Sequence, residues 1–261
     1  MATYNKRGYK TPKVKEEKID NDFIEDVKID ESQSTTAGVF NSLDATASKT
    51  EEWVAKNQKV IIGVVVGVAA LALGYMGYSK FVAEPNEQDA ADQMFVAQQN
   101  FQNATEGIAA DSLYTLSLNG SEGKYGFLKI IEEYSGTKSA NLANYYAGIA
   151  YLNLGKYDQA IEYLEKFKSD DKILSTLAIG AIGDAHSQKG QQKEAMEFYV
   201  KAFESNKNDF TTPRFLLKAG KVALELGNKA DALKYFTEIK EAYESTQEAQ
   251  GIDALIGLAQ S

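Results

Sequence analysis

Residues 141–164 read NLANYYAGIAYLNLGKYDQAIEYL, and the chain repeats the spacing of this stretch twice more. The glycines at 155, 190 and 227 are separated by 35 and then 37 residues, close to the roughly 34-residue period of a two-helix repeat. Each copy has a small residue seven positions before that glycine and an alanine five positions after it: Gly148 and Ala160, Gly183 and Ala195, Gly220 and Ala232. Small residues let two helices cross closely, and glycine turns the chain between them. Each copy is therefore predicted to be a helical hairpin.

One hairpin of this kind cannot bury its apolar face alone, so neighbouring copies must stack. The repeats are predicted at about 141–174, 176–209 and 213–246, with a closing helix over 249–259. Ahead of them, 87–102 has apolar residues at helical spacing, 124–134 resembles the second helix of a preceding repeat, and 105–123 is expected to be irregular. The sequence predicts an all-α fold in which residues 84–261 form one solenoid.

A run of twenty residues without any charge, Val60–Ser79 (VIIGVVVGVAALALGYMGYS), lies between Lys59 and Lys80. As a helix rising about 1.5 Å per residue it extends roughly 30 Å, the thickness of the hydrocarbon core of a bilayer. A cleavable signal peptide would lie nearer the start of the chain. The alternative, a buried helix of a soluble protein, seldom lacks charge over this length. We therefore predict an uncleaved, single-pass transmembrane helix over residues 59–80, in contact with a lipid bilayer.

Basic residues flank this run unevenly. Lys49, Lys56 and Lys59 lie just before it, whereas the next basic residue after Lys80 is Lys124. Because lysine and arginine resist translocation, the N-terminus is predicted to be cytoplasmic and residues 81–261 to lie across the membrane.

Small residues form a stripe along the same run. They recur at intervals of four, three, four and three: Gly63, Gly67, Ala70, Gly74 and Gly77. In lipid, such a stripe lets two helix backbones approach closely, which predicts packing against a second copy or another protein. The alternative is that glycine and alanine are simply frequent in membrane helices.

The segment before the run divides into parts of different character. Residues 1–18 carry a net charge of +4 and residues 19–31 one of −5, so 1–33 is predicted to be a disordered cytoplasmic arm. Residues 34–58 are predicted to be an amphipathic juxtamembrane helix. Within them, Ser48 and Glu51 form an S-x-x-E capping box, which predicts that a helix begins at Ser48 and continues through the span.

Composition excludes several functions. The chain has no cysteine, one histidine (His186) and a net charge of −9, so a thiol nucleophile, an imidazole metal cluster and a nucleic-acid surface are all disfavoured. The adjacent carboxylates Glu132 and Glu133, and Asp170 and Asp171, project in different directions on a helix and favour solubility over acid–base work. We expect no enzymatic activity, no cofactor and no metal.

The hairpin repeats resemble tetratricopeptide repeats, and the layout of anchor plus repeats resembles the YfgM-type membrane-anchored proteins of the bacterial Sec translocon. The segment TEEWVAKNQKVIIGVVVGVAALALGYMGYSKFV and the repeat segment quoted first carry this resemblance, which covers about residues 48–261. The arm before residue 48 departs from the compact tail of better-known members and is similar to arms in Bacteroidota relatives. The resemblance implies an inner-membrane protein with periplasmic repeats, near SecYEG and a membrane-anchored prolyl-isomerase-like chaperone, that aids exported client proteins.

The resemblance also implies a protein-binding groove lined by the first helix of each repeat. The family's groove positions fall on Leu142, Tyr145, Ile149, Leu152 and Asn153, then Leu177, Gly180, Asp184, Ser187 and Gln188, then Arg214, Leu217, Lys221, Leu224 and Glu225. The clamp that binds peptide C-terminal carboxylates needs lysine and asparagine where this chain has Tyr145 and Ile149, which disfavours that ligand. The competing interpretation assigns Tyr145 and Leu152 to packing between helices.

Two other functions stay open. The chain is compatible with an envelope scaffold for division, outer-membrane assembly or gliding machinery, which would have different partners. It is also compatible with a membrane-bound signalling regulator whose arm binds a cytoplasmic protein.

Overall fold

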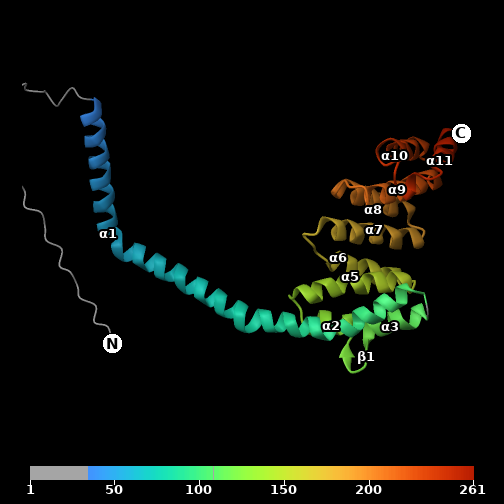
Figure 1. Ribbon diagram of the computed structural model, residues 1–261, viewed down its shortest axis with the longest axis horizontal. Coiled ribbons are helices and arrows are strands. Elements are labelled where there is room, and N and C mark those ends of the chain that lie inside the picture. Colours follow the sequence, from blue (N-terminus) through green and yellow to red (C-terminus); the bar gives the residue numbers. More distant parts are fainter. Residues whose placement is uncertain (1–34, 108) are drawn as a thin grey trace, which may run out of the picture. The chain divides into compact units, whose positions relative to one another are not determined.

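The computed structural model describes residues 35–107 and 109–261, and most of that chain is helical (Figure 1). The predicted arm 1–33 lies outside the described residues. The chain divides into two units between Leu71 and Ala72. Outside one two-stranded hairpin, the described elements are helices, so the predicted all-α fold is confirmed.

The first helix, α1, spans Thr35–Tyr78. A short π-helix, η2 (Ser79–Ala83), follows it directly and leads into α2 (Glu84–Thr105). Pro85 occupies the first turn of α2. Because proline lacks an amide hydrogen and crowds the carbonyl four residues earlier, the wider π turn just before it lets the helix continue without a loop.

The prediction that this helix begins at Ser48 is wrong, because α1 begins at Thr35 and runs through Ser48 without interruption. The residues on both sides of Ser48 include alanine, lysine and glutamate, which favour a helix, and neither glycine nor proline stops it between 39 and 62. A capping box in such a segment has no helix terminus to cap.

The expectation that 105–123 is irregular is also wrong. It contains a ten-residue helix, α3 (Ala110–Asn119), in which Tyr114 and Leu118 are buried. The strands β1 (Gly120–Ser121) and β2 (Lys124–Tyr125) then form a short antiparallel hairpin. The turn-forming residues at 119–123 therefore mark only this hairpin, and α4 (Phe127–Glu133) follows it.

The predicted repeats contain three pairs of helices stacked in chain order (Figure 1). The first helices of the pairs are α5 (Lys138–Asn153), α7 (Lys172–Gln188) and α9 (Thr212–Glu225), and the second helices are α6 (Tyr157–Lys166), α8 (Gln192–Ser205) and α10 (Lys229–Ala242). A 3₁₀ turn, η3 (Gln247–Ala249), and α11 (Ile252–Gln260) close the chain against α10.

Within each pair, a glycine of the first helix lies against a large side chain of the second. A Cβ added to Gly148 would lie 2.5 Å from Leu164 Cγ, and one added to Gly220 would lie 2.3 Å from Phe236 Cε1. The turn glycines at 155, 190 and 227 have φ of +71°, +73° and +73°, a conformation that side chains disfavour. The structure thus confirms both roles predicted from the spacing, close crossing at the first glycine and a chain turn at the second.

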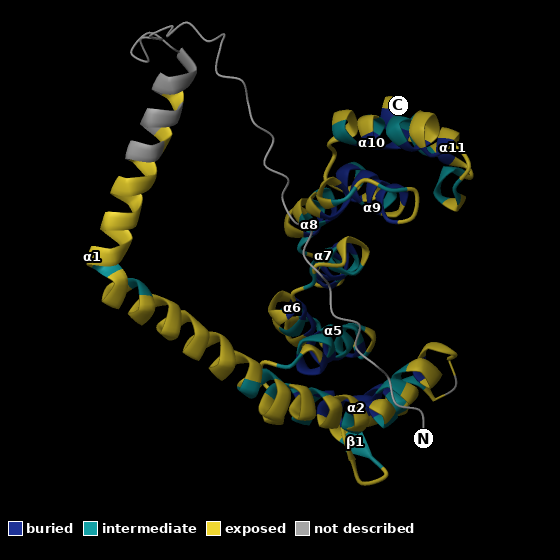
Figure 2. Ribbon diagram, turned by 60° about the vertical axis from the view of Figure 1, so that its left-hand side comes forward, coloured by how far each residue is buried: buried dark blue, intermediate teal, exposed yellow. Residues whose placement is uncertain are grey.

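Burial follows this packing (Figure 2). Buried residues form three clusters along the repeat region, of which one joins α2, α3, α4 and α5. That cluster includes Ala90, Met94 and Ala97, so α2 is part of the solenoid core. By contrast, α1 is exposed over almost all of its described length.

Candidate protein-binding groove

Two neighbouring hollows follow the first helices of the repeats. The larger, of about 590 Å³, is lined mainly by α5, α7 and α9. The smaller, of about 540 Å³, is lined by α2, α3 and α5. Asn153 lines both, so the two hollows adjoin. We call them together the repeat groove.

Most residues proposed from the repeat pattern line this groove. The larger hollow contains seven of them: Leu152, Asn153, Asp184, Ser187, Gln188, Lys221 and Glu225. The smaller hollow contains Tyr145 and Ile149, again with Asn153. Whether these residues bind a partner stays a prediction.

The other proposed residues lie outside the lining of the groove. Four half-buried leucines pack against the hydrophobic clusters instead: Leu142, Leu177, Leu217 and Leu224. Gly180 is buried against the ring of Phe215, and Arg214 is exposed in the first turn of α9. The leucines lie outside because their positions on the first helices also face the neighbouring repeat.

Asp184 is the centre of a hydrogen-bonded cluster in the larger hollow. Its carboxylate accepts a hydrogen bond from the Tyr199 hydroxyl at 2.7 Å and pairs with Lys218 Nζ at 2.5 and 2.7 Å. Burial, together with the charge of Asp184, raises the pKa of Tyr199 far above its usual value. The ammonium of Lys218 also lies 5.6 Å from the centre of the Tyr199 ring, a cation–π geometry. The cluster therefore satisfies both the aspartate and the lysine internally.

Tyr145 packs against neighbouring aromatic rings and also lines the smaller hollow. Its ring centre lies 5.9 Å from that of Tyr146 and 5.3 Å from that of Phe167. Burial raises the pKa of Tyr145, the Tyr146 hydroxyl adds to this, and the charge of Arg214 acts in the opposite direction. Leu152 similarly packs on a core cluster and lines the larger hollow. Packing and groove roles are therefore compatible for both residues.

Several groove residues were missed by reasoning from the sequence. In the larger hollow they are Tyr157, Tyr199, Lys218 and Val222, and in the smaller hollow Phe101, Ala104, Thr105, Ala110, Asp111 and Tyr114. The opposite charges of Asp184 and Lys218 lie 34 residues apart, one repeat period, and this spacing is a signal that would have found the pair. The α3 residues were missed because their segment was expected to be irregular.

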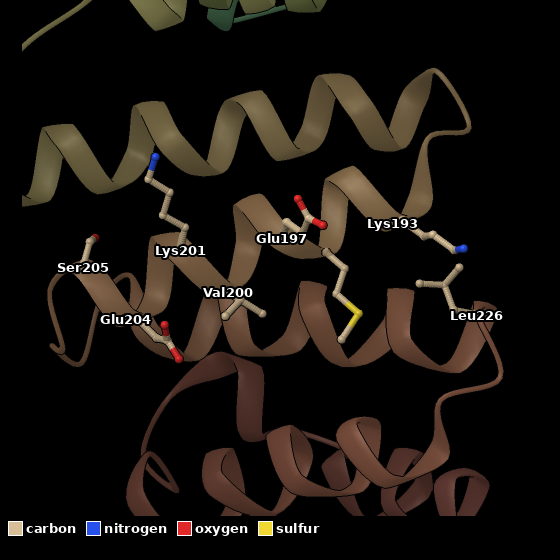
Figure 3. A pocket seen from close by; sticks show the side chains of 8 residues that line it. Lys193, Glu197, Val200, Lys201, Glu204, Ser205 and Leu226 are labelled. Atoms are coloured by element: carbon tan, nitrogen blue, oxygen red, sulfur yellow. The ribbon is translucent and has the colours of Figure 1, made fainter.

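A second kind of surface hollow lies along α8 (Figure 3). This α8 trough has a volume of about 710 Å³ and an apolar floor that includes Met196, Val200 and Leu226. Two lysines and two glutamates line it, Lys193, Lys201, Glu197 and Glu204. Their charges balance, so the trough has no electrostatic preference for either sign.

Three of the four carboxylates considered for acid–base chemistry have structural partners: Asp171, Glu132 and Glu133. Asp171 Oδ1 accepts hydrogen bonds from the amides of Ile173 and Leu174 at the start of α7. Glu132 and Glu133 both pair with Lys129. These carboxylates therefore serve helix capping and surface ion pairing.

His186 is half-buried between two helices. Its ring stacks on Phe198 with centres 5.2 Å apart, and its Nδ1 lies 2.8 Å from Gln191 Oε1. The ring thus holds α7 against α8.

Comparison with known families identifies the repeats. One model of the tetratricopeptide repeat matches residues 142–171 and 215–246, and a second matches residues 178–209. The chain therefore contains tetratricopeptide repeats, a class of solenoid whose extended surfaces are typical of scaffolds for protein–protein interaction and that is typically non-enzymatic. A search of curated proteins finds no match to the chain.

One helical segment of the described chain, Thr46–Thr105, contains a stretch long and apolar enough to cross a membrane. None of that apolar stretch is buried inside the protein. A core helix of a soluble protein would bury most of these residues, so their exposure favours a membrane anchor over a buried helix.

Proposed function

We propose that this protein is a membrane-anchored scaffold that binds other proteins through the repeat groove. In this proposal residues 34–58 form a juxtamembrane helix, residues 59–80 cross the bilayer, and residues 84–261 form the binding domain, whose three repeats occupy about 141–174, 176–209 and 213–246. The observation that carries the proposal is the combination of an unburied apolar helix with a tetratricopeptide solenoid in one chain.

The proposed location is a bacterial inner membrane, with the N-terminus cytoplasmic and the repeats periplasmic. The asymmetry of lysines around the span supports this orientation. Tethering then confines the groove to the membrane surface, so a high effective concentration substitutes for high affinity.

The proposed partners are the SecYEG translocon, a membrane-anchored prolyl-isomerase-like chaperone and exported client proteins. The resemblance to YfgM-type proteins of the Bacteroidota kind supports this assignment. In this role the groove would hold segments of newly exported chains and aid their handover or folding. The small-residue stripe on α1 would supply a separate contact within the bilayer.

The first test is extraction and topology. Alkaline carbonate should leave the full-length protein in the membrane, and protease added to spheroplasts should digest residues 84–261 while sparing the N-terminal arm. Release by carbonate would contradict the anchor, and protection of the repeats would contradict the orientation.

The second test is site-specific photo-crosslinking in intact cells. A crosslinker placed at Leu152 or Lys221 in the groove should capture translocon components or exported proteins, identified by mass spectrometry. The same crosslinker at Lys234, on α10, is the matched control. Equal capture from all three sites would contradict a binding role for the groove, and capture of division or outer-membrane assembly proteins would favour the alternative scaffold.

A further inference from the structure

The α8 trough is separate from the repeat groove. Its lining comes from α8 and from Leu226 at the end of α9, and it shares no residue with the lining of either groove hollow (Figure 3). On its floor Met196 and Val200 are half-buried, and Leu226 is 39% exposed. The trough therefore leaves apolar surface uncovered in a place that binding at the groove does not use.

The charged side chains along the trough alternate in sign. They follow one another at intervals of four, four and three residues: Lys193, Glu197, Lys201 and Glu204. This spacing places them on one face of α8. Within residues 35–107 and 109–261, no opposite charge lies within ion-pair distance of any of the four. Because the charges sum to zero, net charge selects no partner here, and only their order can select one.

This order of charges is complementary to itself when the helix is reversed. A second α8 that runs antiparallel, with its middle against the middle of the first, places Lys193 opposite Glu204 of the second copy. In the same register, Glu197 faces Lys201 of the second copy. Each pair occurs twice, because a two-fold axis relates the copies. A parallel copy in register would instead place like charges opposite one another, which disfavours binding.

The same rotation brings the apolar floors together. Met196 and Val200 lie on either side of the middle of α8, which spans Gln192–Ser205. In the antiparallel pair, each of these two side chains therefore approaches the other one in the second copy. Their contact removes apolar surface from water, and the ion pairs beside it fix the register of the two helices.

We infer that the α8 trough binds a second copy of this chain, with the two α8 helices antiparallel. This goes beyond the proposed function, because it adds a contact between copies that does not use the lining of the groove. One helix pair is small beside the roughly 1,200–2,000 Å² that stable interfaces bury. The strength of the contact therefore rests on the proposed anchor, which confines both copies to one membrane and raises their effective concentration.

The first experiment is cysteine crosslinking of the full-length protein in lipid vesicles. The chain has no cysteine, so an introduced cysteine is the only thiol of its copy. Val200→Cys, close to the two-fold axis, should form a disulfide with the second copy under mild oxidation. Lys234→Cys on α10, which is exposed and outside the trough, is the matched control. Its yield should be about tenfold lower, because a disulfide needs Cβ atoms about 4 Å apart.

The antiparallel register has its own test. Lys193 is near one end of α8, so the same residue of the second copy lies about 16 Å away along the helix. Lys193→Cys alone should therefore form little disulfide, whereas a mixture of Lys193→Cys and Glu204→Cys chains should form a mixed dimer. Equal yields from Lys193→Cys alone and from the mixture would overturn the inference. So would a Val200→Cys yield no greater than that of its control, which would leave the trough to another protein.

The charges are tested by complementation, with the Val200→Cys disulfide as the readout. Lys201→Glu places an acidic side chain opposite Glu197 at both symmetry-related positions and should lower the yield about fivefold. Glu197→Lys places lysine opposite Lys201 and should lower it similarly. An equal mixture of the two chains should restore the yield, since each changed charge then faces an opposite one.

The control for folding is circular dichroism, which should show equal helix content in the two charge variants and the wild type. Loss of the disulfide in both charge variants without recovery in their mixture would overturn the inference, because a complementary pair would then have no effect. Unchanged yields in the separate variants would overturn it as well.

Failure of this inference is distinguishable from failure of the proposed function. Protein that does not enter the vesicles would contradict the anchor, and with it both proposals. Protein that is anchored but gives no selective disulfide at Val200→Cys would contradict this inference alone. The small-residue stripe on α1 does not confuse the two, since association through that stripe alone would not favour Val200→Cys over Lys234→Cys.

Discussion

Glycines recur in two regions of this protein, once in the first helix of each repeat and along one stripe of α1, and their surroundings differ completely. A Cβ added to Gly148, Gly183 or Gly220 in the repeats would lie within 2.3 to 2.7 Å of a side chain from the paired helix. A Cβ added to Gly63 or Gly67 on α1 would meet nothing within 4 Å, and the same holds for Gly74 and Gly77. The repeat glycines are explained by contacts inside the chain, whereas the α1 glycines are not.

The contrast is the one expected if the repeat helices pack in water and α1 packs in lipid. In water, close helix crossing brings apolar side chains together and removes their surface from solvent. In lipid that gain is absent, and small residues matter only by letting a second backbone approach. A small-residue stripe that contacts none of the described side chains is the arrangement expected of a packing surface for another membrane helix.

The largest effect is expected from placing leucine at Gly220. Its side chain would overlap the ring of Phe236, since even a Cβ lies 2.3 Å from that ring. Overpacking of this kind costs about 3 kcal/mol, which lowers the melting temperature of a domain of this size by about 6–12 °C. Thermal unfolding of the full-length protein in detergent, followed by circular dichroism, measures the shift.

The control for that experiment is the same substitution at Gly67. Because nothing lies within 4 Å of its Cβ position, the unfolding of the repeat domain should be unchanged. Equal melting temperatures for the Gly220→Leu protein and the wild type would contradict the packing shown here.

The next effect concerns association in the membrane. If the stripe packs against another helix, Gly67→Leu should weaken that association by about tenfold, because the leucine side chain keeps the two backbones apart. The measurement is self-association in lipid by energy transfer, together with recovery of translocon partners after mild solubilisation. Val65→Leu, at a position off the stripe, should have no effect. Unchanged association in the Gly67→Leu protein would mean that the stripe only reflects the composition of membrane helices.

The same contrast shows what the sequence could and could not predict. The repeat glycines were placed correctly because each has a local consequence, a positive φ or a close crossing, at a fixed spacing. The sequence did not predict α3, because the turn-forming residues at 119–123 were treated as typical of the whole segment 105–123. Tyr114 and Leu118, four residues apart, have the apolar spacing of a helix. The start of α1 was predicted too late, because the capping-box sequence at Ser48 lies inside a helix that already begins at Thr35.

The groove was predicted in part for a similar reason. Repeat positions identify residues such as Asp184 and Lys221, which project from the first helices. They do not identify Tyr199, which reaches the groove from α8, because that contact depends on how two helices cross. Nor does a family pattern reveal that Asp184 forms an ion pair with Lys218 of the next repeat.

The smallest effect is expected where α2 joins the repeats. Glu87 on α2 accepts hydrogen bonds from the amides of Lys138 and Ser139 at 2.6 and 2.8 Å and from the Ser139 hydroxyl at 2.6 Å. It thus supplies an acceptor to the free amides at the start of α5. Glu87→Gln should lower the free energy of unfolding at neutral pH by about 1 kcal/mol. Glu84→Gln, which removes an ion pair with Lys80 on the surface, is the matched control and should change it by less.

The pH dependence of this difference identifies its cause. Burial raises the pKa of Glu87, but the hydrogen bonds from Ser139 and from the amides of Lys138 and Ser139 outweigh burial, so the pKa lies below its ordinary value of 4.5. A carboxyl with a lowered pKa in the folded protein stabilises it fully above the ordinary pKa, and the stabilisation is lost as the pH falls through the folded pKa. The stability gap between wild type and Glu87→Gln should therefore be constant near neutral pH and shrink as the solution is acidified below 4.5. A gap independent of pH would mean that Glu87 acts by packing and that its charge does not hold α2 to α5.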